Sequence, residues 1–284
     1  MITLQDALQK GKKVLTENNI DNGEYDAWLL LAFYFQLSRA AYLADPSKEI
    51  SRNDLEAYMD LIGKRSKHIP LQYITGEQEF MGLEFLVKEG VLIPRQDTEI
   101  LVMEALKVSK DKEILDICSG SGCILLSLLK LGGGKTGIGA DISETALLVS
   151  RENAKRLGVT AEFIKSDIYS QISKTYDIIV SNPPYIPTGI IPTLMEEVKE
   201  YEPTIALDGK EDGLYFYREI CKGLKEHLNP GGYVFFEIGY DQGKAVMELL
   251  AEAGMDDINI IKDLAGLDRV VTGRWNEKKG EPFT

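Results

Sequence analysis

The chain has 284 residues, of which 44% are apolar and 27% charged, a composition typical of folded globular proteins. This length accommodates a small domain beside a larger one. The net charge of −13 argues against direct binding of nucleic acid, because Lys and Arg side chains supply most of the affinity for phosphates. The same acidity would suit a basic protein partner.

Cysteine usage and the N-terminus indicate where the protein works. The three cysteines, Cys118, Cys123 and Cys221, form neither a CxxC pair nor a His/Cys cluster, so we expect no metal site and no disulfide framework. Residues 1–10 lack the apolar segment of a signal peptide. The longest apolar run, 27–35, is about half the length of a membrane span. The sequence therefore predicts a cytoplasmic protein without a membrane anchor.

The first part of the chain predicts a small helical domain. Residues 1–68 carry apolar side chains at helical spacing, with Thr3 and Ser51 placed as N-caps. Between 69 and 95, aromatic and β-branched residues alternate around glycines, which predicts a β-hairpin linker.

Residues 96–284 predict a second, α/β domain. Short apolar runs such as "EILDI", "YDIIVSN" and "GYVFFEIG" alternate with helical segments. Such alternation favours βαβ units, a parallel sheet and helices on both of its faces, which is a Rossmann-like architecture. The stretch 258–275 predicts a terminal antiparallel hairpin.

A glycine-rich turn marks the expected ligand site of this second domain. The sequence "DICSGSGCI" (116–124) follows a predicted strand and opens a helix, and its glycines would let the backbone approach a ligand. Leu125 stands where a dinucleotide fingerprint needs its third glycine. Asp141 and Asp167 end the next two strands, where a carboxylate would accept hydrogen bonds from ribose hydroxyls. Together they predict a nucleoside pocket without a phosphate grip, although each Asp alone could be a helix cap or turn former.

The stretch "SNPPYIP" (181–187) ends the fourth strand at the same edge. Pro183 and Pro184 stiffen the chain, so that the Asn182 side-chain oxygen and the Pro183 carbonyl can act as fixed acceptors for the N–H groups of a planar amide or amine. Tyr185 offers a ring for packing on that flat group and for cation–π stabilisation. A nucleoside-like cofactor without phosphate recognition indicates S-adenosylmethionine, and the stretch predicts methylation of a planar nitrogen.

Several blocks resemble the HemK/PrmC family of S-adenosylmethionine-dependent protein-(glutamine N5) methyltransferases, which modify the GGQ glutamine of peptide chain release factors. The resemblance covers nearly the whole chain, and its most specific part is the hairpin block "ITGEQEFMG…LIPRQDTE". The other blocks are "DICSGSGCI", "SNPPYIP", "GKEDGLYFYREI", "PGGYVFFEIGYDQG" and "GLDRVV".

The resemblance implies a class I methyltransferase fold for residues 96–284 and a substrate-recognition role for the bundle of residues 1–68. It implies that the amide substrate contacts Asn182, Pro183, Pro184 and Tyr185, and that Phe80, Arg95 and Glu99 line the site. The implied cofactor contacts are Cys118, Ser119, Gly120, Ser121, Gly122, Asp141, Asp167, Ile168 and Asn182.

Three other functions are weighed against this one. A nucleic-acid amino-methyltransferase acting on adenine N6 or guanine N2 could use the same Asn-Pro-Pro-Tyr stretch, but the net charge and the absence of a basic module argue against it. A non-catalytic cofactor-binding or assembly factor would not need that stretch. An NAD-dependent oxidoreductase is disfavoured by Leu125. His68 and His227 have no partner pattern and receive no catalytic role, and the acidic run 196–203 is expected to be a solvated loop or helix.

Overall fold

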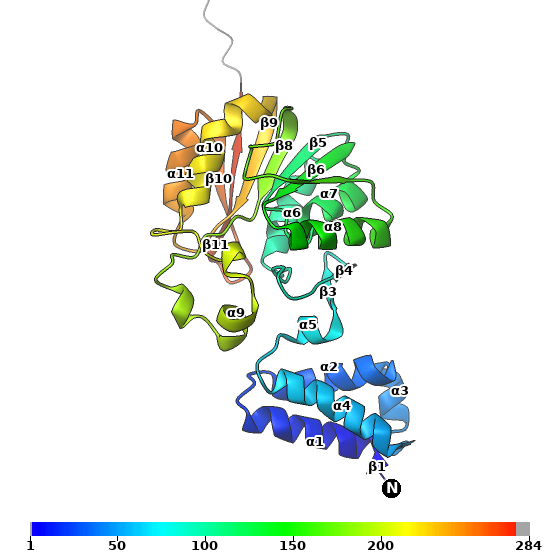
Figure 1. Ribbon diagram of the computed structural model, residues 1–284. Coiled ribbons are helices and arrows are strands. Elements are labelled where there is room, and N and C mark those ends of the chain that lie inside the picture. The colour runs from blue at the N-terminus through cyan, green and yellow to red at the C-terminus, as the bar shows by residue number, and fades with distance from the viewer. Residues whose placement is uncertain (1, 277–284) are drawn as a thin grey trace, which may run out of the picture. The chain divides into compact units, whose positions relative to one another are not determined.

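The computed structural model describes residues 2–276 (Figure 1). The chain forms two compact units. One contains the residues up to Glu77 together with Met195–Tyr201, and the other contains Gln78–Leu194 and the residues from Glu202 onward. No helix in the described range is long and apolar enough to cross a lipid bilayer.

The first unit is helical, with one short antiparallel strand pair. Thr3 and Ser51 are N-caps, and each forms a capping box with an Asp three residues later. Tyr58 is fully buried in the centre and donates from its hydroxyl to the Ala27 carbonyl over 3.0 Å. The elements are β1 (Ile2–Thr3), α1 (Leu4–Glu17), α2 (Gly23–Phe35), α3 (Arg39–Ala44), β2 (Glu49–Ile50), α4 (Arg52–Arg65), α5 (Leu71–Thr75) and α9 (Glu196–Tyr201).

A buried arginine attaches α9 to this unit. Arg65 donates from Nε to Asp26 over 2.8 Å and pairs through Nη1 with Glu197 of α9, also at 2.8 Å. Tyr201 donates from its hydroxyl to the Lys67 carbonyl over 2.6 Å. The acidic run 196–203, expected as a solvated loop or helix, therefore begins with a helix whose carboxylates pair within the helical unit.

The expected hairpin over 69–95 is shorter in the structure. Only β3 (Glu77–Phe80) and β4 (Leu83–Leu86) pair as strands. Residues Leu71–Thr75 form the helical turn α5, which follows Pro70 and ends where Gly76 adopts a left-handed φ of 82°. The β-branched and aromatic composition of this turn predicted a strand, but the flanking Pro and Gly supply a helix start and stop.

A seven-stranded sheet forms the centre of the second unit, in the order β10-β11-β9-β8-β5-β6-β7. The strands from β9 to β7 run parallel, whereas β11 pairs antiparallel with both β9 and β10, so the terminal antiparallel hairpin is confirmed. The strands are β5 (Glu113–Ile117), β6 (Thr136–Asp141), β7 (Glu162–Lys165), β8 (Tyr176–Ser181), β9 (Leu228–Glu237), β10 (Asp256–Lys262) and β11 (Asp268–Arg274).

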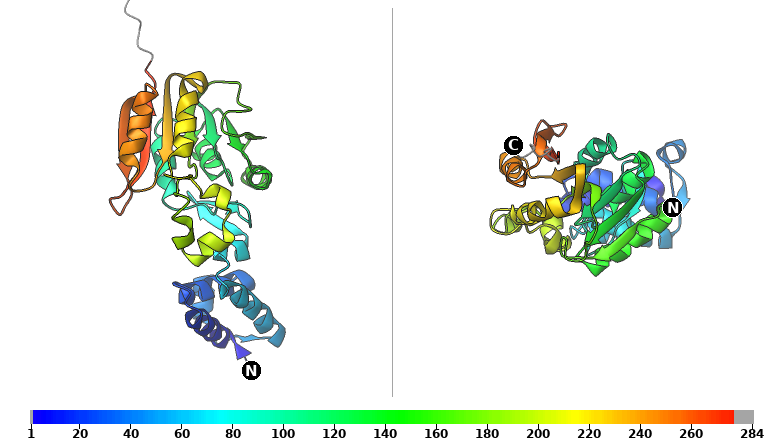
Figure 2. Two further views of the ribbon diagram at one scale, coloured as in Figure 1. Left: turned by 60° about the vertical axis from the view of Figure 1, so that its left-hand side comes forward. Right: turned by 90° about the horizontal axis from the view of Figure 1, so that it is seen from above.

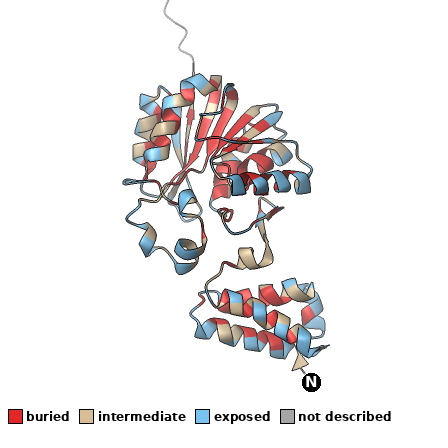
Figure 3. Ribbon diagram, viewed as in Figure 1, coloured by how far each residue is buried: buried red, intermediate tan, exposed pale blue. Residues whose placement is uncertain are grey.

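Helices cover both faces of this sheet, as Figures 1 and 2 show. Residues of α6, α7 and α8 pack in one apolar core and residues of α10 and α11 in another, and alternate residues of the strands contribute to the two cores. The parallel strands are buried along much of their length (Figure 3). The helices are α6 (Thr98–Leu106), α7 (Cys123–Gly132), α8 (Glu144–Leu157), α10 (Tyr215–His227) and α11 (Gly243–Glu252). The predicted α/β class is confirmed.

The sheet order places a ligand site. The chain leaves β5 toward β6 on one side, while β8 lies on the other side of β5. A crevice opens beyond the carboxyl ends of the strands at such a switch point, and ligands of open α/β sheets bind there.

Candidate active site

A cavity of about 300 Å³ lies at this edge of the sheet. Its walls come from the ends of β5, β6 and β8, the loop after β7, and segments 90–98 and 203–216, all within the second unit. The predicted site residues that line it are Arg95, Cys118, Ser119, Gly120, Ser121, Asp141, Asp167, Ile168, Asn182 and Pro184.

The two glycines of the turn after β5 serve different purposes. Gly120 has a φ of 54° and lines the cavity, and a Cβ added there would meet nothing within 4 Å. Gly122 has a φ of 79°, and its Cβ would lie 3.1 Å from both Ser150 and Phe163. Gly120 therefore leaves room on the cavity side, whereas Gly122 allows close packing on α8 and β7. Gly122, predicted as a cofactor contact, does not line the cavity.

Asp141 fixes the turn at the end of β6. Its Oδ2 accepts from the Gly120 backbone N–H over 2.8 Å, and its Oδ1 accepts from the Ser143 N–H over 2.8 Å. Burial raises the pKa of Asp141, while these backbone hydrogen bonds lower it. The carboxylate can still accept a hydrogen bond from a ligand hydroxyl.

The loop after β7 contributes an apolar wall and a polar one. Ile168 has a φ of 49°, and its carbonyl accepts from the Ser166 hydroxyl over 2.9 Å. The Asp167 N–H donates to Ser170 Oγ over 3.0 Å, which leaves the Asp167 side chain at the cavity. Ile142, which directly follows β6, also lines the cavity, as do Ile124 and Ile205, so four isoleucines contribute to its apolar lining.

Asn182 directly follows β8, where the strand is fixed by the Ser181 hydroxyl donating to the Ile117 carbonyl over 2.6 Å. The Asn182 side chain donates from Nδ2 to Thr98 Oγ1 over 3.3 Å. This contact uses the amide nitrogen and leaves the side-chain oxygen available to a ligand. A rigid acceptor at the edge of the cavity is the feature that the Asn-Pro-Pro-Tyr stretch predicts.

Tyr185 lies differently from the expectation. Neither Tyr185 nor Pro183 lines the cavity, and burial raises the pKa of the Tyr185 hydroxyl. That hydroxyl donates to Glu237 Oε1 over 3.5 Å. The Tyr185 carbonyl accepts from Gln242 Nε2 over 2.9 Å, which holds the chain after the prolines.

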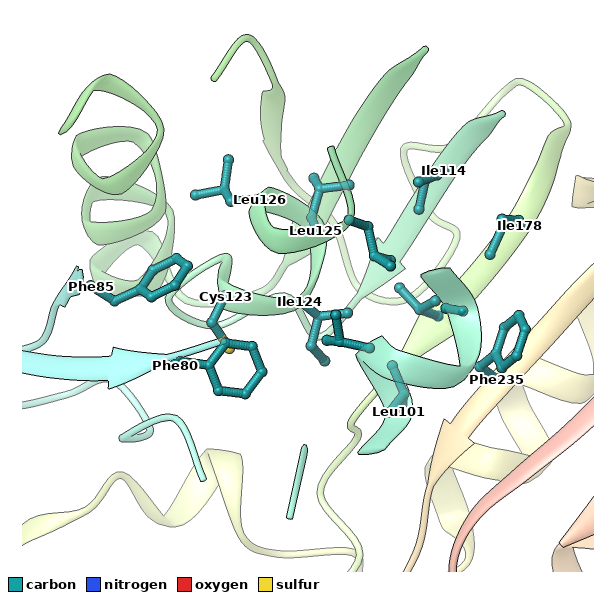
Figure 4. Packing of buried hydrophobic residues seen from close by; sticks show 14 of the residues in the cluster. Phe80, Phe85, Leu101, Ile114, Cys123, Ile124, Leu125, Leu126, Ile178 and Phe235 are labelled. Atoms are coloured by element: carbon teal, nitrogen blue, oxygen red, sulfur yellow. The ribbon is translucent and has the colours of Figure 1, made fainter. Parts of the chain in front are cut away.

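Two of the three residues expected to line the site lie elsewhere. Phe80 is 1% exposed and packs in the apolar core beside Phe85 and Cys123 (Figure 4). Glu99 accepts from the Met81 N–H over 2.6 Å and so anchors the β3–β4 turn. Arg95 does line the cavity and pairs with Glu202. The position of Phe80 and Glu99 within a motif does not show whether their side chains face the core or the cavity.

Sequence reasoning missed Thr98, Gln242 and Glu237. Thr98 lies in a segment that the sequence marks only as helical. Glu237 could have been noticed in the sequence, because it is an acidic residue at the end of the otherwise apolar strand "GYVFF", at the edge of the sheet where the site lies.

Neither histidine lines the cavity. His68 lies 3.8 Å from Glu196 in the helical unit, and His227 stacks on Tyr169.

Comparison with solved structures defines the class of fold. A methyltransferase from Pyrococcus furiosus superposes with a TM-score of 0.54 at 18% identity, covering 70% of this chain and 91% of that one. The T. thermophilus 16S rRNA N2 G1207 methyltransferase, solved in complex with AdoMet and guanosine, gives 0.51 at 16% identity over 70% of this chain and 50% of that one. Residues 96–194 match the methyltransferase small domain. The second unit has the fold of class I S-adenosylmethionine-dependent methyltransferases.

Sequence relatives are more specific. Residues 6–76 match the PrmC N-terminal domain. A release factor glutamine methyltransferase of Clostridium botulinum is 43% identical over 95% of this chain and 99% of its own length. One of Geobacter sulfurreducens is 39% identical over 96% of both chains. The chain belongs to the release factor glutamine methyltransferase family, which confirms the resemblance seen in the sequence.

Proposed function

We propose that the protein transfers the methyl group of S-adenosylmethionine to the side-chain amide nitrogen (N5) of the glutamine in the GGQ motif of peptide chain release factors. The observation that carries this proposal is the Asn182 carboxamide, whose nitrogen is bound by Thr98 while its oxygen stays available at the cavity edge. Family membership supplies the identity of the substrate.

The cavity fits the cofactor in three respects. Asp141 can accept hydrogen bonds from ribose hydroxyls, Gly120 leaves space where any other residue would place a Cβ, and Ile168 offers an apolar surface to a base. Cys118, Ser119, Ser121 and Asp167 complete the proposed contacts. When bound, the cofactor supplies a methyl group on a positively charged sulfur.

The protein's part in the reaction is to hold the acceptor amide. A carboxamide nitrogen is a weak nucleophile because its lone pair is delocalised. The Asn182 oxygen and the Pro183 carbonyl would accept hydrogen bonds from its two N–H groups and so aim the nitrogen at the methyl carbon. Transfer to this nitrogen would form a C–N bond, break the C–S bond to leave a neutral sulfur, and release one of the two amide protons to solvent. Acceptors that are fixed in advance stabilise the developing positive charge without reorganisation.

The helical unit is proposed to recognise the release factor. The acidity of the chain would favour a basic protein partner, and we propose no direct contact with nucleic acid. Such an enzyme would act in the cytoplasm.

Tyr25 and Leu43 of the helical unit have side chains that are 62% and 64% exposed, and they offer apolar contacts to a partner. Replacing both with Ser should raise KM for the release factor and leave cofactor affinity unchanged. An unchanged KM would contradict this role.

Incubation with methyl-labelled S-adenosylmethionine and a purified release factor tests the reaction. We expect label on the GGQ glutamine, none when that glutamine is replaced by Ala, and little with the Asn182→Ala enzyme. Parallel incubations with bulk RNA and DNA serve as the comparison. Greater labelling of nucleic acid, or labelling that survives loss of the glutamine, would overturn the proposal.

A further inference from the structure

A buried carboxylate lies beside the proposed amide site. Glu237 ends β9 and is 1% exposed. The parallel pairing of Ser181 with Phe236 places it next to Asn182 across the strands, and Val270 pairs with it from β11. Burying an ionisable carboxyl is costly unless it is paired or serves a purpose.

Glu237 has few partners for so buried a group. Tyr185 Oη donates to its Oε1, whereas Oε2 receives no hydrogen bond from the described residues. Burial raises the pKa of Glu237, and the nearby Thr98 hydroxyl is the strongest influence that lowers it. Thr98 is also the residue that binds the Asn182 side chain, so the three side chains lie together.

The charged and titratable groups around Glu237 come from several elements. Arg269 of β11 attracts the carboxylate, but it also pairs with Asp97 at 3.3 Å and Asp263 at 3.1 Å. Asp97 itself disfavours the charged form. Two further titratable groups face Glu237, Cys123 from α7 and Tyr217 from α10. Tyr217 Oη donates to the Glu237 backbone carbonyl over 2.7 Å.

The direction of the hydrogen bonds follows from proton counting. Thr98 has a single hydroxyl proton, and its oxygen already accepts from Asn182 Nδ2. An ionised carboxylate can only accept, so a Thr98 hydroxyl that turns toward Glu237 must donate its hydrogen bond to the carboxylate. Thr98 then has no proton for the Asn182 oxygen and can only receive from the Asn182 nitrogen.

We propose that Glu237 is a positioning residue for the methyl transfer. Its carboxylate holds the Thr98 proton, which obliges Thr98 to bind the nitrogen of the Asn182 carboxamide and keeps the Asn182 oxygen directed at the substrate amide. The inference rests on the proposed function, because it assigns a role to that oxygen.

Removing the negative charge of Glu237 should release Asn182 from this orientation. A Gln at position 237 can donate to Thr98 Oγ1, which frees the Thr98 proton for the Asn182 oxygen. The carboxamide can then turn and present its own N–H groups to those of the substrate, donor against donor. Protonation of Glu237 would act in the same way, and burial raises its pKa to about 7.

Three variants test the inference: Glu237→Gln, Thr98→Val, and Thr98→Ser as the matched control that keeps the hydroxyl. We expect Glu237→Gln and Thr98→Val to lower kcat about 10- to 100-fold, as misplaced substrate groups do. The cofactor Kd, measured by calorimetry, should stay near that of the wild type, and Thr98→Ser should retain most of the activity. The kcat of the wild type should rise with pH through about 7, and that rise should vanish in Glu237→Gln.

Wild-type turnover in Glu237→Gln, a Thr98→Ser variant as slow as Thr98→Val, or a parallel loss of cofactor affinity would overturn the inference. So would a pH profile that is unchanged in Glu237→Gln. Failure of the proposed function is seen separately, because the wild-type enzyme would then leave the release-factor glutamine unmethylated before any variant is compared.

Discussion

Replacing Gly120 with Ala should separate cofactor binding from folding. The substituted residue would adopt a left-handed φ of 54°, which costs a non-glycine residue about 1–2 kcal/mol of stability. Its Cβ would meet no protein atom within 4 Å, so packing adds no further cost. Because Gly120 lines the cavity, the same methyl group would occupy space proposed for the cofactor.

A methyl group at a tight contact surface changes binding by about 1–3 kcal/mol, which corresponds to roughly 10- to 100-fold in cofactor Kd. Gly133→Ala is the matched control. Gly133 has a φ of 64°, also has nothing within 4 Å of its Cβ, and ends α7 away from the cavity lining. Both variants should therefore lose similar stability.

The assay is calorimetric titration with S-adenosylmethionine, combined with thermal or urea unfolding of the same samples. We expect weaker binding in Gly120→Ala alone and a similar loss of stability in both variants. Equal cofactor affinity in the two variants would refute the assignment of Gly120 to the cofactor surface.

Three further predictions concern the site and the core. Asn182→Ala should slow single-turnover methyl transfer about 10²- to 10³-fold, as loss of a preorganised polar group does, and weaken cofactor binding much less. A rate loss of less than about tenfold would contradict the role of its oxygen. Phe80→Ala should lower the free energy of unfolding in urea by about 3–5 kcal/mol, because it leaves a cavity in the apolar core, and KM of the folded enzyme should not change. Unchanged stability with a raised KM would instead place Phe80 in the substrate site. Since the pKa of Glu237 is raised from 4.5 to about 7, the folded state holds the extra proton between these values, and stability should fall by about 3 kcal/mol as pH rises through that window. Glu237→Gln should lack this fall in urea titrations across pH, and parallel curves for the two proteins would contradict it.

Much of the fold could be predicted from the chain because its local signals agree. Thr3 and Ser51 are both caps with an Asp three residues on, and a capping box depends on neighbours alone. Leu71–Thr75 departs from the expected hairpin because its strand-like residues lie between Pro70 and Gly76, which start and stop a helical turn. The acidic segment Glu196–Tyr201 is a helix, one of the two expected forms, and only the structure shows that Glu197 pairs with Arg65, far away in the sequence.

Some residues of the candidate site could be predicted from the sequence and others could not. Gly120, Asp141 and Asn182 could be predicted together because each lies at or just after the end of a strand, and the carboxyl ends of parallel strands meet at one edge of a sheet. Phe80 and Glu99 could not be placed from the sequence. Whether a residue near the site faces the cavity or the core depends on how the hairpin packs, and the pattern of a short strand does not show this.

The sequence by itself determined the class of fold, the edge of the sheet that carries the site and the family, because these follow from local patterns and motif blocks. Only the tertiary structure decided how Asn182 is held. Its partner Thr98 lies 84 residues earlier in the chain, and Glu237 lies 52 residues beyond Tyr185. Hydrogen-bond direction depends on which donors and acceptors meet in space, and that meeting is set by strand register and helix packing.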